Sequence, residues 1–140
     1  MDRRAMLALG AASAAALQTG ASALGQTSPP TATGARSSAV KLFALYDRPD
    51  DPAAFFKHYE TVHAPLVKKT PGLQSFVLNR VTADAFGGEP RYVLIAEMTY
   101  PDRATFEAAM KSPENAAVGQ DLMSFAKGKV SVLVADSAEA

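Results

Sequence analysis

Two histidines, His58 and His63, are the first residues of this sequence to consider for chemistry. The chain of 140 residues contains no other histidine, no cysteine and no tryptophan. Imidazole titrates near neutral pH, so it can take up and release a proton under ordinary conditions. Tyr59 precedes His63 by four residues, and an imidazole beside a hydroxyl is a usable general base. We expect His63 and Tyr59 to be catalytic; the alternative is a structural histidine that bonds a carbonyl freed by Pro65.

His58 is expected to have a different role. Five residues of regular α-helix turn its side chain about 140° away from that of His63, so the two rings should not hold one metal ion from the same face. The sequence also offers no pair of histidines four residues apart and no carboxylate cluster of the metal-binding kind. We therefore predict no metal site, and we interpret His58 as a structural or solvated residue on the helix flank.

Further polar groups lie near apolar runs, among them Tyr46, Asn79, Glu97 and Asp121. Glu97 has apolar neighbours, so an inward-facing carboxyl would have to be paired or protonated. The alternative is an edge ion pair with Arg80 or Arg91. The pair Gly87-Gly88 lies in a loop and does not fit a phosphate-binding or dinucleotide motif, which needs a glycine-rich turn between strand and helix.

One helix must carry both histidines. Asp51 is a suitable N-cap and Pro52 a suitable first residue. The helix has one apolar row and a neighbouring second row, with the spacing of an amphipathic helix; these rows are Phe55, Tyr59, Val62, Leu66, and Phe56, His63, Val67. Pro65 cannot donate a backbone hydrogen bond, so a kink or restart is expected beside His63.

The remaining pattern predicts strands over residues 40–46, 73–81, 91–100 and 130–135, with a second helical region that is capped by Asp102 and restarts at Ser112. The order is β-α-β-β-α-β, an α+β ferredoxin-like fold with an antiparallel sheet and both helices on one face. The other face remains apolar, with residues such as Phe43, Leu45, Phe76 and Leu78 or their alternates. A patch of that size needs a cover, so we predict a homodimer whose sheets close into a barrel.

The N-terminal residues predict export. Arg3 and Arg4 precede a short apolar run, and Ala21-Ser22-Ala23 is a small-residue cleavage site. The paired arginines are typical of a twin-arginine signal; a buried N-terminal helix is the alternative. We expect a signal peptide at 1–23, a flexible linker at 24–38, a folded domain at 39–136 and a tail at 137–140, without a membrane span in the mature, periplasmic form. The net charge of zero gives no sign of a nucleic-acid surface.

The folded region resembles the EthD family of the dimeric α+β barrel superfamily. The matching segments are residues 46–49, 58–73, 95–97 and 112–126. The resemblance implies the same fold and dimer, and a small pocket between the first helix and the sheet. It also places Asp121 at a family position in the second helical region. The residues that we expect to bind substrate are Tyr46, Phe56, Val67, Asn79, Glu97 and Asp121.

The resemblance fixes the fold better than the reaction. It implies an oxidoreductase, reductase- or monooxygenase-like, that acts on a small hydrophobic or aromatic molecule with His63 as acid and base, and the N-terminal residues predict that this enzyme is exported. No cofactor is predicted. The alternatives are a cofactor-free isomerase or lyase, an accessory protein that binds a ligand or haem without chemistry, and a structural dimer with a filled cavity.

Overall fold

The computed structural model describes residues 38–140. The predicted signal peptide and the predicted linker up to residue 37 lie outside the described residues. The chain follows the predicted order of elements, with helical regions divided into shorter segments: β1 (Ala39–Asp47), α1 (Pro52–His58), the π-helical segment η1 (Tyr59–His63), α2 (Ala64–Val67), β2 (Ser75–Arg80), β3 (Tyr92–Tyr100), α3 (Arg103–Met110), α4 (Pro113–Phe125) and β4 (Val130–Ser137).

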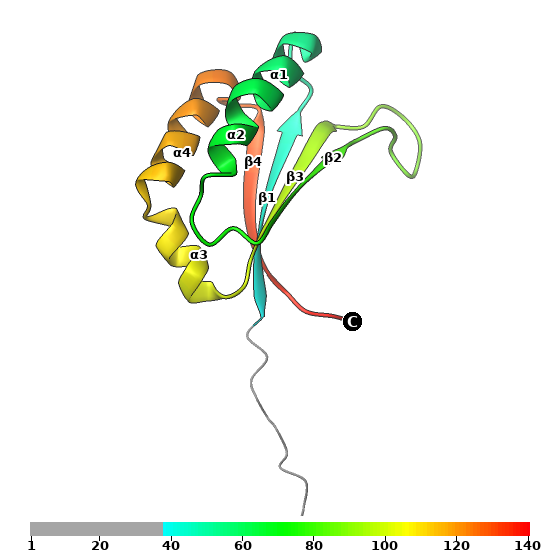
Figure 1. Ribbon diagram of the computed structural model, residues 1–140. Coiled ribbons are helices and arrows are strands. Elements are labelled where there is room, and N and C mark those ends of the chain that lie inside the picture. Colours follow the sequence, from blue (N-terminus) through cyan, green and yellow to red (C-terminus); the bar gives the residue numbers. More distant parts are fainter. Residues whose placement is uncertain (1–37) are drawn as a thin grey trace, which may run out of the picture. The chain divides into compact units, whose positions relative to one another are not determined.

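The four strands form one antiparallel sheet in the order β2-β3-β1-β4. Figure 1 shows the helices together on one side of this sheet. This is the predicted α+β ferredoxin-like arrangement, and it places the long strands β1 and β3 in the middle of the sheet, beneath the helices. Within residues 38–140, no helix has the length and apolar character that crossing a membrane requires.

The helix starts follow the predicted capping residues. Asp51 accepts a hydrogen bond from the backbone N–H of Ala54 at 3.0 Å, with Pro52 at the first position of α1. Asp102 caps α3 and Ser112 caps α4 in the same way. Each cap satisfies an N–H group that has no partner inside the helix. Local residue types in the sequence therefore determine where α1, α3 and α4 begin.

The core lies between the helices and one face of the sheet. Alternate residues of β1 and β3 point toward the helices, as strand geometry requires; they are Val40, Ala44 and Tyr46 on β1, and Leu94, Ala96, Met98 and Tyr100 on β3, all buried. Phe55 and Tyr59 pack on Tyr46 with ring centroids 5.4 Å away in each case. This aromatic cluster fixes the helical layer over β1, next to the histidines.

The other face of the sheet is apolar and has no helix over it. It carries Phe43 and Leu45 as predicted, and also the exposed Val77 and Leu133. Of the alternatives left open for β2, Phe76 and Leu78 do not lie on this face. They pair with Met98 and Ala96, which point toward the helices, so β2 has the opposite phase and Val77 is its residue on the open face.

Candidate active site

A wide helical turn carries the two histidines. In η1 the backbone N–H of Ala64 donates to the carbonyl of Tyr59, five residues back rather than four. Pro65 has no N–H to continue a regular ladder. The hydroxyl of Thr61 also donates to the carbonyl of Lys57 at 2.7 Å, a contact that competes with regular helix. The irregularity that we expected beside Pro65 is therefore a π-helical turn.

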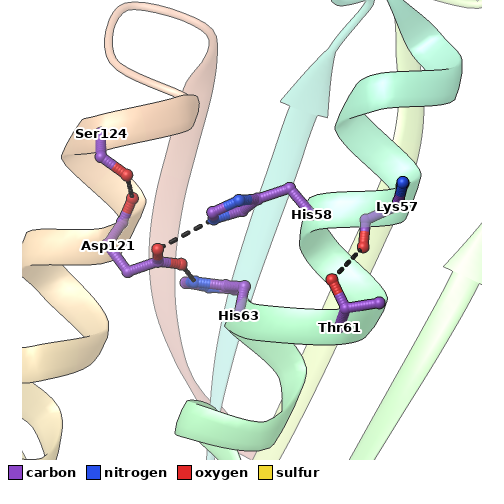
Figure 2. A network of polar contacts seen from close by, with 6 residues as sticks. All are labelled: Lys57, His58, Thr61, His63, Asp121 and Ser124. Carbon is purple, nitrogen blue, oxygen red and sulfur yellow. Dashed lines mark hydrogen bonds and ion pairs between the residues drawn. The ribbon is translucent and has the colours of Figure 1, made fainter.

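This turn brings His58 and His63 to the same side of the helix. In a π-helix the hydrogen bond spans five residues, so residues five apart lie roughly one turn apart. The angle of about 140° that regular α-helix predicts for this pair is therefore wrong. Both rings point toward α4, where Asp121 lies between them (Figure 2).

Asp121 binds both histidines with a single carboxylate. Its Oδ2 lies 2.8 Å from Nδ1 of His63, and its Oδ1 lies 2.8 Å from Nε2 of His58. The His63 side chain is 3% exposed and that of Asp121 12%, whereas that of His58 is 33% exposed. The network thus runs from the domain interior to its surface. Figure 2 shows that the network joins the first helical region to α4, far apart in the sequence.

The hydrogen bond to Asp121 determines which nitrogen of His63 is available. An ionised carboxylate only accepts hydrogen bonds, so Nδ1 of the neutral ring carries the proton and Nε2 holds the lone pair. Burial lowers the pKa of His63. The hydrogen bond that His63 donates to Asp121 and the negative charge of Asp121 oppose this effect, and the charge of His58 adds to it. At neutral pH the ring is therefore uncharged, with Nε2 as its basic atom.

His63 lines a cavity of about 190 Å³ between the helices and the sheet. Among residues 38–140, Nε2 of His63 has no hydrogen-bond partner, and no polar side-chain atom there is both fully buried and unpartnered. Nε2 is therefore open to the cavity. The walls are mostly apolar: Leu42, Ala44, Tyr46, Tyr59, Val67, Met98, Met110, Asn115, Val118, Gly119, Leu122 and Val132.

Two tyrosine hydroxyls lie beside His63. The Tyr46 and Tyr59 rings pack edge to face, with their centroids 5.4 Å apart. Burial raises the pKa of both tyrosines, that of Tyr59 to about 12, so both remain protonated at neutral pH. The ring centroids of Tyr59 and His63 are 5.1 Å apart, and both side chains line the cavity.

The structure brings together some of the residues expected at the site and separates others. Tyr46, Tyr59, Val67 and His63 meet at the cavity, and Asp121 lies behind the His63 ring. Three residues lie elsewhere: Phe56 stacks under the guanidinium of Arg80, Asn79 donates to the carbonyl of Ile95, and Glu97 lies on the open sheet face.

Glu97 is paired, but its partner is not one of the arginines that we expected. The ion pair forms with Lys41 of β1, since both residues point to the open face of the sheet. Arg80 pairs with Glu60 and Arg91 with Asp47. The partner of Glu97 depends on the register between the strands, and the sequence pattern does not predict that register.

Sequence reasoning missed His58, Asn115 and Gly119 as parts of the site. The signal for His58 was the combination of Thr61 and Pro65, which together favour an irregular turn between the two histidines. Asn115 and Gly119 both lie on α4, four residues apart, and so face the cavity together. The weak apolar pattern of α4 gave no clear indication of its inner face.

The residues present do not fit a haem group. The cavity is smaller than the roughly 300 Å³ at which pockets for drug-sized molecules begin. Within the described part of the chain, no three histidine, cysteine, aspartate or glutamate side chains are arranged to hold a metal ion. The polar side chains of the cavity are the imidazole of His63, the hydroxyls of Tyr46 and Tyr59, and the amide of Asn115.

The sequence and fold are similar to those of known proteins. Residues 48–129 match the EthD domain family. An uncharacterized 11.0 kDa protein from the thcB-thcC intergenic region of Rhodococcus erythropolis is 33% identical over 96 residues, which cover 69% of this chain and 92% of that protein. The crystal structure of an ethyl tert-butyl ether D family protein from Bacillus halodurans is 37% identical, covers 71% of this chain and 99% of its own, and has a TM-score of 0.68.

Two enzymes of known activity share the fold at low identity. SnoaB, a cofactor-independent oxygenase from Streptomyces nogalater, is 13% identical, with a TM-score of 0.55 over 74% of this chain and 97% of its own. A hydroxynitrile lyase from Passiflora edulis is also 13% identical, with a TM-score of 0.61 over 74% of this chain and 96% of its own. These likenesses concern the fold alone.

Proposed function

Because this chain belongs to the EthD domain family, we propose that it is a small-molecule enzyme in which His63 moves a proton. The observation that carries the proposal is the orientation of the His63 ring. Its Nδ1 is held by Asp121 at 2.8 Å, while Nε2 is open to a mostly apolar cavity beside Tyr59. A neutral, oriented imidazole in such a site has the properties of a general base.

The proposed step is removal of a proton from an acidic C–H or O–H group of the substrate. Nε2 takes the proton, the substrate keeps the electron pair, and the imidazolium that forms is stabilised by Asp121 at Nδ1. The Tyr59 hydroxyl donates to the oxygen on which negative charge develops. Return of the proton to another atom is isomerisation, and loss of a leaving group is elimination.

An oxidoreductase is the more specific form of this proposal. The anion left by His63 would transfer electrons to O₂, so that the substrate is oxidised and O₂ reduced without a bound cofactor. SnoaB shows that the fold accommodates an oxygenase that needs no cofactor, and the hydroxynitrile lyase shows that it also accommodates a lyase. That support is fold-level analogy.

The substrate class follows from the cavity. Its volume of about 190 Å³ compares with the roughly 150 Å³ of an engineered protein cavity that holds benzene. The walls are leucine, valine and methionine side chains with a few convergent polar groups. A hydrophobic molecule built on one aromatic or alicyclic ring, with one acidic proton near an oxygen, matches this site in size and polarity.

We also infer a homodimer that is exported to the periplasm. The apolar open face of the sheet supports the dimer, because an uncovered face with Phe43, Leu45 and Leu133 is unfavourable in water. The paired arginines Arg3 and Arg4 and the small residues before position 24 support export.

Proton exchange tests the central proposal. Single-ring phenols, enols and ketones would be incubated with the protein in D₂O, with deuterium incorporation and oxygen uptake as the two measurements. We expect His63→Ala to lower the rate of any accelerated exchange by about 10²- to 10⁴-fold while circular dichroism shows a folded domain. The exposed Phe86→Ala variant is the control and should retain the full rate. Undiminished exchange by His63→Ala would refute a role for this ring.

A further inference from the structure

His58 and His63 share one carboxylate, and this arrangement couples them. Each ring has a nitrogen 2.8 Å from a different oxygen of Asp121. Both rings also contact Phe125, with centroid distances of 4.7 Å for His58 and 4.9 Å for His63. The three side chains of the network come from two elements that pack against each other, α4 and the helix that contains η1.

The two rings face different surroundings. His63 lines the inner cavity, whereas His58 lines a separate surface cleft of about 540 Å³. The charged groups of that cleft are two carboxylates and two ammonium groups, Asp50, Asp51, Lys127 and Lys129. Lys129 and Asp50 form an ion pair at 2.9 Å. The cleft therefore has no net excess of either sign, and His58 is the imidazole in its wall.

We propose that His58 is a positioning residue that acts on His63 through Asp121, so that the charge of His58 sets how strongly His63 holds a proton. This proposal rests on the proposed function, in which His63 is the base. It goes further because it assigns a role to a surface residue that does not line the cavity.

The physical reason is competition for one negative charge. When His58 is neutral, its N–H holds Oδ1 and thereby directs Oδ2 toward Nδ1 of His63. When His58 gains a proton from the cleft, its positive charge pairs with the same carboxylate. The carboxylate then offers less stabilisation to a second positive charge on His63. The other polar groups that line the cavity with His63 are the hydroxyls of Tyr46 and Tyr59, which stay protonated, and the uncharged amide of Asn115. Asp121 and His58 are therefore the charged groups that act on His63.

Imidazole NMR of the untagged wild-type protein gives the first test. The chain contains only two imidazoles, so both titration curves can be followed separately. Coupled groups titrate as a pair, and we expect the His63 curve to show a second inflection at the midpoint of His58. Two independent curves, each with a single inflection, would overturn the proposal without any variant.

The variant His58→Gln gives the second test. Glutamine retains a side-chain N–H that can reach the carboxylate but cannot titrate. We expect His63 to titrate as a single group with its midpoint raised by about half a pH unit or more, because a neighbouring positive charge is gone. The matched control is Lys57→Gln, which removes a positive charge from the adjacent exposed residue and should leave the His63 curve in place. An unchanged His63 curve in His58→Gln would reduce His58 to a packing residue.

The double variant identifies the path of the coupling. In an Asp121→Asn background, His58→Gln should shift the His63 midpoint much less than it does in the wild type, as expected when a shared partner is removed. A shift of the same size in both backgrounds would show that Asp121 does not connect the rings. These titrations need no substrate. The titrations can therefore contradict the role of His58 while His63→Ala still abolishes turnover. They can also confirm the coupling when His63→Ala leaves turnover unchanged.

Discussion

At the scale of single residues, Asp121 determines the chemistry of the site. Its carboxylate fixes the proton of His63 on Nδ1 and leaves Nε2 as the atom that faces the cavity. Without that contact the ring could expose either nitrogen. The carboxylate also supplies the charge that supports an imidazolium in a site where burial disfavours one.

The pKa of His63 predicts how the domain responds to acid. Burial lowers this pKa below its ordinary value of 6.5, so the unfolded chain takes up the proton at a higher pH than the folded domain. Between those two values the unfolded state binds more protons, and the free energy of unfolding therefore falls as the pH falls. We expect urea unfolding to show this loss from about pH 6.5 downward, and the acid limb of any His63-dependent activity to lie below 6.5.

His63→Gln provides the comparison, because glutamine does not titrate there. The difference in unfolding free energy between wild type and variant should shrink as the pH is lowered through this range. A difference that stays constant with pH would mean that the buried ring does not resist protonation.

At the scale of elements, the wide turn η1 brings the site together. Sequence reasoning located the helix, its cap at Asp51 and the irregularity near Pro65, because these depend on local residue types. It did not place His58 beside His63. In a regular α-helix, with about 100° per residue, the two side chains would point in different directions about the helix axis. The five-residue hydrogen bonds of η1 bring them to the same side.

In the sheet, too, the sequence predicted the local features but not the pairing between strands. Alternation predicted the strands and the inner face of β1, since side chains alternate strictly along a strand. The phase of β2 and the partner of Glu97 depended on pairing between strands, which alternation does not specify. Of the residues expected at the site, Tyr46, Tyr59 and Val67 line the cavity with His63, whereas Phe56, Asn79 and Glu97 do not line it.

Gly72 allows the turn that precedes β2 to pack closely against α3. It has a φ of +74°, and a Cβ built on it would lie 2.3 Å from Cγ2 of Thr105 on α3. Gly128 has nearly the same φ, +77°, with no atom near its Cβ position. We expect Gly128→Ala to lower the free energy of unfolding by about 1–2 kcal/mol, from backbone strain alone. Gly72→Ala should cost about 1–3 kcal/mol more, because Thr105 must move.

Chemical denaturation of the two variants measures that difference. Thr105→Ser in the Gly72→Ala background removes the clashing methyl group and should recover most of the extra loss. Equal losses for the two glycine variants would show that α3 adjusts to the turn at no cost.

At the scale of the whole molecule, the open face of the sheet is the surface at which we propose that two copies of the chain meet. Phe43 and Leu45 occupy its centre, and the exposed side chains of Val77 and Leu133 extend it to the two edge strands. The ion pair of Lys41 with Glu97 lies within this surface. A second copy that packs face to face would remove the apolar side chains from water.

A single charge on this face tests the dimer. Leu133 is 56% exposed in the single chain, so Leu133→Glu should leave the fold intact while it places a carboxylate between the two sheets. We expect sedimentation equilibrium to show a dimer for the wild type and a monomer for the variant. Phe86→Glu, in an exposed loop away from the sheet, is the matched control and should remain dimeric. A wild-type monomer at micromolar concentration would contradict the predicted barrel.

Gly119 has a consequence for how this molecule could change over time. It lies within α4, where glycine costs about 1 kcal/mol relative to alanine, yet it forms part of the cavity wall. A Cβ at this position would meet no atom within 4 Å. Larger side chains there would narrow the cavity, while the carboxylate and the two imidazoles keep their contacts. In the proposed enzyme, mutation of this one codon would therefore change which molecules enter the cavity without changing the residues that act on them.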